Sequence, residues 1–344
     1  MKRIYILLSI LLSMGFLACD NEVSTIGEWK EITVVYGLLN PNDSISYIKI
    51  TKAFLGGGNA LSYARISDSS EYPHKLEVSI EEYHEGNFIK KIDFDTTTIY
   101  HKEEGIFYSD AQQIYRAVTH QMLSDQNTYK LVIRNPKTGK LITAETPLVD
   151  ENMIIQQPRI NNITHPTINI LDNEYTKAVS ILSSKNGRRY EVYLTFNYEE
   201  VMKGSDIPVK KSIVWRSFPT RKSANANGGE ELNFDFVTQS FWRWLNKEIP
   251  YADEAMEERV EKRYAGQIVF TFQVAEEQFN TYMEVNEPSL SIVQERPTYT
   301  NIENGIGIFS ARYDKERAFY LSETSSNTLW KDYFLLKFVN PDNK

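Results

Sequence analysis

The sequence predicts a mainly β protein of two domains: an N-terminal immunoglobulin-like β-sandwich and a C-terminal β-rich α+β domain with a few short helices. The chain has 344 residues, which is longer than one hydrophobic core usually serves. Aromatic residues make up 12% of the chain, with 21 Tyr and 17 Phe, and such residues favour the pleated surface of a sheet. Several segments alternate apolar and polar residues with the period of two that a half-buried strand requires.

Residues 1–18 are predicted to be a signal peptide. Lys2 and Arg3 give a basic start, residues 4–17 are almost wholly apolar, and no acidic residue occurs before Asp20. The apolar run of about 14 residues is shorter than the roughly 20 that a membrane-spanning helix needs. We therefore expect an export signal that is cleaved.

Cys19 is the only cysteine of the chain and directly follows this run. The segment FLAC at residues 16–19 resembles the bacterial lipobox, in which a small residue precedes a cysteine that is diacylated on sulfur and becomes the new N-terminus. Ala18 and Cys19 match that pattern, whereas Phe16 stands where leucine is commoner. We predict lipid attachment at Cys19, because acyl chains hold a protein on a membrane. The alternative is an ordinary signal peptide with an incidental cysteine.

The composition excludes several classes of function. The formal net charge is −8, and loss of Lys2 and Arg3 makes the mature chain more acidic still, so nucleic acid is not an expected partner. Arg188 and Arg189 are interpreted as solvated strand or turn residues. Without a second cysteine the protein has no intramolecular disulfide, and its mature domains have no thiol catalyst. Six adjacent glutamate pairs are interpreted as solubilising surface: Glu81-Glu82, Glu103-Glu104, Glu199-Glu200, Glu230-Glu231, Glu257-Glu258 and Glu276-Glu277.

Residues 19–29 are predicted to be a polar tether and residues 30–148 the β-sandwich. Strands are expected at 31–39 and 44–54, around turn residues 40–43, and again at 74–83. Residues 128–146 form a predicted hairpin, with Pro136 and Gly139 in its loop. No helical segment separates these strands, which favours a sandwich. The strand at 31–39 is expected to lie at an edge, where it could accept a strand of a partner protein.

The proline-rich residues 147–166 mark a boundary, which gives a second domain at 149–344. A strong strand is predicted at 188–200, where every second residue from Tyr190 to Tyr198 is apolar. Another is expected at 266–274, after which the period changes to that of a helix. Two further helices are predicted at 238–250 and 252–264, the second heavily charged.

A search for catalytic motifs finds no serine-nucleophile elbow, no phosphate-binding loop and no zinc-protease motif. The glycine-rich residues 55–60 are interpreted as a flexible strand connection. None of the five histidines has a spacing typical of zinc ligands. We therefore predict no catalytic residue, no cofactor and no metal.

The aromatic segment SFWRWL holds the candidate contact residues, Trp242 and Trp244. An exposed Trp242 would suit stacking against a sugar or anchoring a partner protein. The favoured interpretation is that this helix packs its aromatic residues onto the sheet, and an exposed contact residue is the alternative.

Residues 298–313, TYTNIENGIGIFSARY, are the most distinctive stretch of the mature chain. Asn304-Gly305 and Gly307 mark a tight turn between apolar residues, which is interpreted as a structural corner. Together with the lipobox, the opening strand and the 128–146 hairpin, this stretch resembles the Bacteroidota cell-envelope lipoprotein family known as domain of unknown function 4249. The resemblance implies an immunoglobulin-like N-terminal part and, often, a TonB-dependent outer-membrane transporter as neighbour. It implies no catalytic residue.

These features predict an outer-membrane lipoprotein that is anchored through Cys19 and is not an enzyme. It would be an accessory or ligand-binding component working with a TonB-dependent transporter. Asp20 and Glu22 resemble the signal for display on the cell surface in Bacteroidota lipoproteins, and the periplasmic face is the alternative. A surface adhesin or assembly component is the second hypothesis, and an enzyme acting on glycans or peptides is the third. The ligand would be a small molecule or a glycan.

Overall fold

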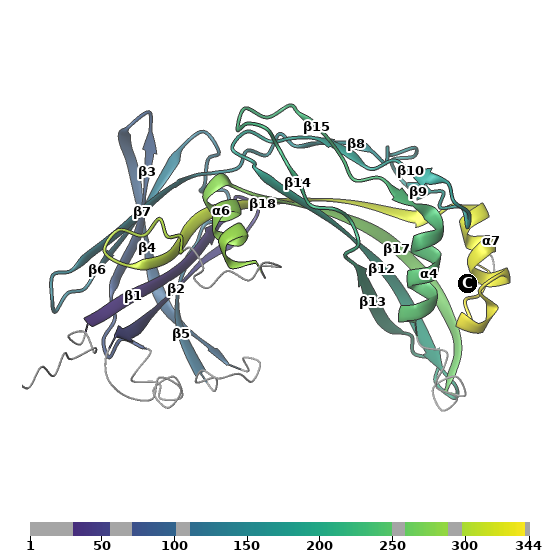
Figure 1. Cartoon of the computed structure of the whole chain (residues 1–344). Coiled ribbons are helices and arrows are strands. Elements are labelled where there is room, and N and C mark those ends of the chain that lie inside the picture. The colour runs from purple at the N-terminus through teal and green to yellow at the C-terminus, as the bar shows by residue number, and fades with distance from the viewer. Residues whose placement is uncertain (1–29, 56–70, 101–110, 250–258, 288–297, 341–344) are drawn as a thin grey trace, which may run out of the picture.

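The computed structural model describes residues 30–55, 71–100, 111–249, 259–287 and 298–340, and the fold is mainly β, as predicted. A sheet of 13 strands dominates the described chain and is accompanied by two small sheets and three short α-helices (Figure 1). The predicted signal peptide, Cys19, the tether and residues 56–60 lie outside the described residues.

Seven consecutive strands form the N-terminal half. They are β1 (Lys30–Leu39), β2 (Ile45–Leu55), β3 (Glu77–His84), β4 (Asn87–Tyr100), β5 (Ala111–Val118), β6 (Thr128–Arg134) and β7 (Leu141–Pro147). Their order in the sheet is β1-β2-β5-β4-β3-β6-β7. The long β4 pairs with β3 through Phe94 and with β5 from Asp95 onward. The strands thereby surround one core, which includes Val78 and Ile80, and the arrangement is consistent with the predicted sandwich.

The strand expected at an edge, β1, lies inside the sheet. It pairs antiparallel with β2 and parallel with β18 (Ile306–Leu321), with Val34 opposite Ile306. The prediction of an open edge at residues 31–39 is therefore wrong. Its second partner comes from the far end of the sequence, and the alternation of side chains along a strand does not reveal such a distant neighbour.

Long strands also form the C-terminal half, in the order β13-β12-β17-β18. They are β12 (Arg189–Met202), β13 (Val209–Trp215), β17 (Val260–Ala275) and β18, and all neighbours are antiparallel. The predicted apolar face of β12 is confirmed, because its alternate residues from Tyr190 to Tyr198 are buried.

Short elements pack beside these strands. They are β8 (Ile154–Gln157), β9 (Thr167–Ile168), β10 (Thr176–Lys177), β11 (Ser180–Leu182), β14 (Arg221–Lys222), β15 (Glu231–Asn233), β16 (Phe236–Val237), α4 (Thr238–Glu248), α6 (Glu277–Asn286), α7 (Glu323–Lys331) and a 3-10 helix (Phe334–Leu336). The strand at 266–274 and the helix after it are confirmed as β17 and α6, and the helix at 238–250 as α4.

One strand joins the two halves. Residues 306–311 of β18 pair with β1, and residues 312–319 pair with β17 on the other side of the strand. Figure 1 shows β18 passing from one half of the molecule to the other, with α6 beside it. Glu303, just before β18, also bridges to Thr143 of β7. A division into two domains at residue 148 stays a prediction, because one sheet runs through both halves.

The charged helix predicted at 252–264 is wrong from residue 260 onward, where β17 begins. Residues 252–258 of that prediction lie outside the described residues. Arg263 of β17 lies opposite Glu200 of β12, and its guanidinium contacts that carboxylate at 2.9 Å. Part of the charge of this segment is thus used for pairing across the sheet.

The glutamate pairs are not all solubilising surface. Glu82, Glu200 and Glu276 are each less than 10% exposed. Glu82 accepts a hydrogen bond from the Tyr129 hydroxyl at 2.8 Å. A doublet on a strand places one member on each face, so Glu82 and Glu200 point inward, whereas Glu276 is buried as the residue that caps α6. Glu103-Glu104 and residues 257–258 lie outside the described residues.

Candidate functional site

A pocket of about 270 Å³ lies where β18 exchanges β1 for β17 as its partner. We call it the junction pocket. It is lined by Leu38, Arg189, Glu191, Gln273, Val274, Ala275, Phe279, Met283, Arg312, Tyr313 and Asp314. These residues come from β1, β12, β17, α6 and β18, so both halves of the molecule contribute to it. Its volume is close to the lower end for ligand pockets, which suits a small ligand.

The register of the sheet places six polar or small residues on its floor in two rows. Residues directly opposite one another on neighbouring antiparallel strands share a face of the sheet, as do residues two apart along one strand. The first row is Arg189, Ala275 and Arg312, and the second is Glu191, Gln273 and Asp314. Two cations therefore flank a small residue, and two carboxylates flank an amide.

Apolar side chains form the remaining wall. Phe279 and Met283 lie four residues apart on α6 and therefore share one face of the helix. Leu38, near the end of β1, lines the pocket with them, and all three are only partly buried. The pocket thus combines a charged floor with an apolar wall, which is the usual composition of a small-molecule site.

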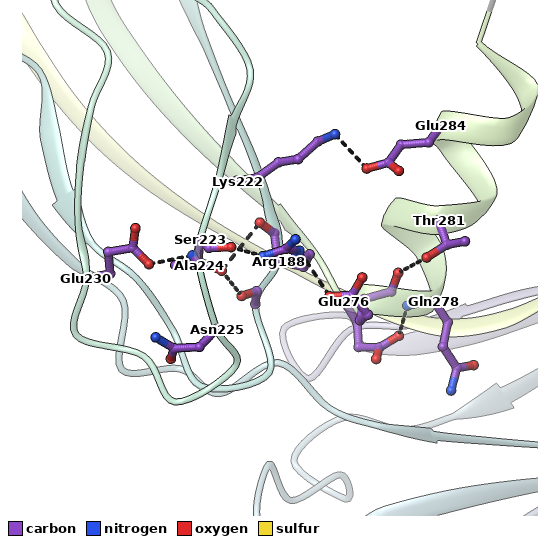
Figure 2. A network of polar contacts seen from close by, with 12 residues as sticks. Arg188, Lys222, Ser223, Ala224, Asn225, Glu230, Glu276, Gln278, Thr281 and Glu284 are labelled. Atoms are coloured by element: carbon purple, nitrogen blue, oxygen red, sulfur yellow. Dashed lines mark hydrogen bonds and ion pairs between the residues drawn. The ribbon is translucent and has the colours of Figure 1, made fainter.

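Three ion pairs hold α6 over the sheet, and Figure 2 shows the one between Lys222 and Glu284. The pairs are Arg188–Glu277 at 3.0 Å, Lys222–Glu284 at 2.6 Å and Arg189–Glu287 at 2.6 Å. Each carboxylate is about half exposed, so each pair stabilises the helix by only about 1 kcal/mol or less. The pairs fix the position of the apolar wall more than they stabilise the fold.

Glu276 anchors the start of α6. Its carboxylate accepts hydrogen bonds from the Gln278 backbone N–H at 2.8 Å and from the Ser310 hydroxyl at 2.7 Å. Its own N–H donates to the Ala311 carbonyl at 3.1 Å. Burial raises the pKa of this carboxyl, and the hydrogen bonds oppose that rise.

Replacing Glu276 by glutamine is expected to change how stability depends on pH. Because the pKa is raised above 4.5 in the folded protein, the folded state keeps this proton to higher pH than the unfolded state. The stabilising contribution is complete below the unfolded pKa and falls as pH rises through the folded pKa. Urea denaturation between about pH 4 and about pH 8 gives the free energy of unfolding of both proteins. The value for the wild type minus the value for Glu276→Gln should fall as the pH rises. A difference that rises with pH would contradict this assignment.

The two arginines of the floor have N–H donors that their ion pairs do not use. Arg189 is only 8% exposed, so its interpretation as a solvated residue is wrong. It pairs with Glu191 at 2.8 Å through Nε and with Glu287 at 2.6 Å through Nη2. Burial lowers its pKa, but both carboxylates outweigh that effect and raise it, so Arg189 stays charged. Arg312 contacts Asp43 at 2.9 Å through Nη2 alone. A guanidinium has five N–H donors, and neither arginine uses all of them in these contacts.

The second row also has free hydrogen-bonding capacity. One carboxylate oxygen of Asp314 accepts a bond from the Asn40 amide at 2.6 Å. Gln273 is partly buried between the two carboxylates, and its side-chain amide makes no hydrogen bond within the described residues. A ligand in the pocket would meet an amide that can both donate and accept.

Packing of α4 accounts for Trp242, and the alternative of an exposed contact residue there is wrong. Trp242 is fully buried, and its indole N–H donates to the Ile170 carbonyl at 3.1 Å. Trp244 is partly exposed and stacks on Trp215 with ring centroids 5.8 Å apart. Neither tryptophan lines the junction pocket, and packing of α4 onto the sheet explains both.

Other features of the described residues point to no chemistry of their own. A second, larger hollow of about 580 Å³ lies near α7, where the His165 and Tyr320 rings stack on each other at 4.3 Å. Within the described ranges, no three His, Cys, Asp or Glu side chains come together as metal ligands. None of the helices in the described part of the chain combines the length and apolarity needed to cross a bilayer.

No protein-family model matches this chain, and no curated protein matches it significantly. The resemblance to the lipoprotein family, and the anchor at Cys19, therefore stay predictions. Sequence reasoning missed the junction pocket because its residues are spread from Leu38 to Asp314. The only local signal was the doublet Arg188-Arg189 at the start of a strongly alternating strand.

Proposed function

We propose that this protein is an outer-membrane lipoprotein that binds a small ligand in the junction pocket and works with a TonB-dependent transporter. The observation that carries the proposal is the pocket itself, with its charged floor, its apolar wall and a Gln273 amide that has no hydrogen bond to any of the described residues. Such a combination of an apolar surface with a few convergent polar groups is typical of ligand sites.

The membrane part of the proposal rests on the sequence. A cysteine that directly follows a short apolar export signal is suited to acylation, and two or more chains hold a protein stably at a bilayer. The protein would act without catalysis of its own, because its polar groups bind and orient a ligand rather than supply a nucleophile with its base.

Co-purification from native membranes tests the transport role. The acylated protein should bring down an outer-membrane transporter from wild-type cells. A Cys19→Ala variant, which cannot be acylated, should remain in the soluble fraction without the transporter. Repeated recovery of the acylated lipoprotein alone would contradict the role in transport.

A surface adhesin or assembly component is the second candidate, favoured by one observation. β13 lies at the edge of the large sheet, and Val209 and Val214 on it are 44% and 45% exposed. An open edge can accept a strand from another protein. However, Lys210 and Lys211 lie on the same strand, and lysines at an edge are typical of strands that resist pairing. Concentration-dependent self-association of the purified protein would favour this candidate.

A further inference from the structure

We infer that the ligand of the junction pocket is a small zwitterion with an apolar side chain, such as a free amino acid with an aliphatic side chain. This inference deepens the proposed function and rests on it. It follows from the order of charges on the pocket floor together with the position of the apolar wall.

Charge order on the floor separates an anion-binding row from a cation-binding row. Arg189 and Arg312 flank Ala275, whose small side chain leaves room between the guanidinium groups. Guanidinium groups bind carboxylates with charge-assisted hydrogen bonds. The first row is therefore suited to the carboxylate of a ligand.

The second row offers the opposite charge. Glu191 and Asp314 flank Gln273, and carboxylates together with an amide oxygen are acceptors for an ammonium group. The rows are two residues apart along the strands, which is about 7 Å. A molecule that carries both charges close together can reach both rows at once, whereas a simple anion or cation can use only one of them.

The apolar wall defines the third part of the ligand. Phe279 and Met283 face the floor from α6, and Leu38 adds to them from β1. Methionine is flexible and fits irregular apolar groups. The floor carries charges of both signs, with two cations and two carboxylates, and Glu287 and Asp43 beside it pair with the two arginines. A zwitterion can therefore find an opposite charge for each of its own charges.

Isothermal titration calorimetry on the detergent-solubilised full-length protein tests the inference, with L-leucine as the probe. Two analogues each lack one charge: leucinamide has no carboxylate, and 4-methylpentanoate has no ammonium. Each should bind at least about 10-fold more weakly than leucine, because each loses the charge-assisted hydrogen bonds to one row of the floor. Equal binding of either analogue would overturn the inference.

Two variants test whether Arg312 binds the ligand directly or acts only through its ion pair with Asp43. Arg312→Gln and Asp43→Asn both break the ion pair between these residues, but only the first removes the cation from the floor. Arg312→Gln should weaken leucine binding at least about 10-fold, while Asp43→Asn should retain it. Equal loss in both variants would show that Arg312 acts only through its pairing with Asp43.

Asp314 provides the matching test of the second row. Asp314→Asn keeps an oxygen that can accept the Asn40 hydrogen bond but removes the negative charge. It should weaken leucine binding while leaving the weaker binding of 4-methylpentanoate unchanged. If leucine does not bind although a transporter co-purifies, the ligand class is wrong and the transport role stands. If leucine binds and no transporter is recovered, the ligand class stands and the transport role is wrong.

Discussion

Replacing Gly307 by alanine is expected to lower the free energy of unfolding by about 4 kcal/mol, from backbone strain and a steric clash together. Gly307 has φ +114°, and a Cβ atom there would lie 2.0 Å from the Val35 carbonyl oxygen. The Val35 carbonyl is backbone and the position of the Cβ atom is fixed by the backbone of residue 307, so neither can move away without separating β18 from β1. Because β18 joins the two halves of the sheet, the loss should affect the whole fold.

Gly139→Ala is the matched control for this prediction. Gly139 also has a positive φ, of +71°, but nothing lies within 4 Å of a Cβ atom there. Gly139→Ala should lower the free energy of unfolding only by the backbone strain, which is about 1–2 kcal/mol. Urea denaturation followed by circular dichroism measures both variants. Equal losses would show that β1 and β18 do not approach as closely as the structure describes.

Replacing Arg263 by methionine is expected to lower the free energy of unfolding by about 3–5 kcal/mol, because it leaves the Glu200 carboxylate buried without its cation. Arg263 is only 2% exposed. Its Nε and Nη2 atoms both contact Glu200 Oε2 at 2.9 Å, and Nη1 donates to the Leu336 carbonyl at 2.8 Å. The last contact also ties β17 to the 3-10 helix near the C-terminus.

Two comparisons isolate the buried charge as the cause. Lys130→Met breaks the exposed cross-strand pair Lys130–Glu145 and should cost less than about 1 kcal/mol. The double variant Glu200→Leu with Arg263→Met removes both charges, so it should be more stable than Arg263→Met alone. A double variant as unstable as the sum of both single changes would show that the two side chains do not act as a pair.

Local patterns predicted the local elements of this fold. The alternation of β12, the 128–146 hairpin and the change of period between β17 and α6 are properties of neighbouring residues, and each is confirmed. The turn before β18 was also interpreted as a structural corner, and Asn304 has the left-handed φ of 60° that fits such a turn.

The features that the sequence did not predict depend on pairing between strands that are far apart along the chain. β1 looked like an edge because its second neighbour, β18, lies more than 250 residues away along the chain. Arg189 was interpreted as solvated and Arg263 was placed in a charged helix, because arginine is usually exposed. Ion pairs with carboxylates explain why both are buried. The junction pocket arises from that same distant pairing, so no motif within a short stretch could have indicated it.

Native mass spectrometry of the lipoprotein extracted from its own membranes tests the central claim most directly. The account predicts a chain that begins at Cys19, carries acyl groups on its sulfur and retains a small bound molecule. It also predicts that Ala275→Leu, which fills the space between Arg189 and Arg312, abolishes the bound molecule and keeps the acyl groups. A chain with a bare thiol, or the same bound molecule in both forms, would contradict it.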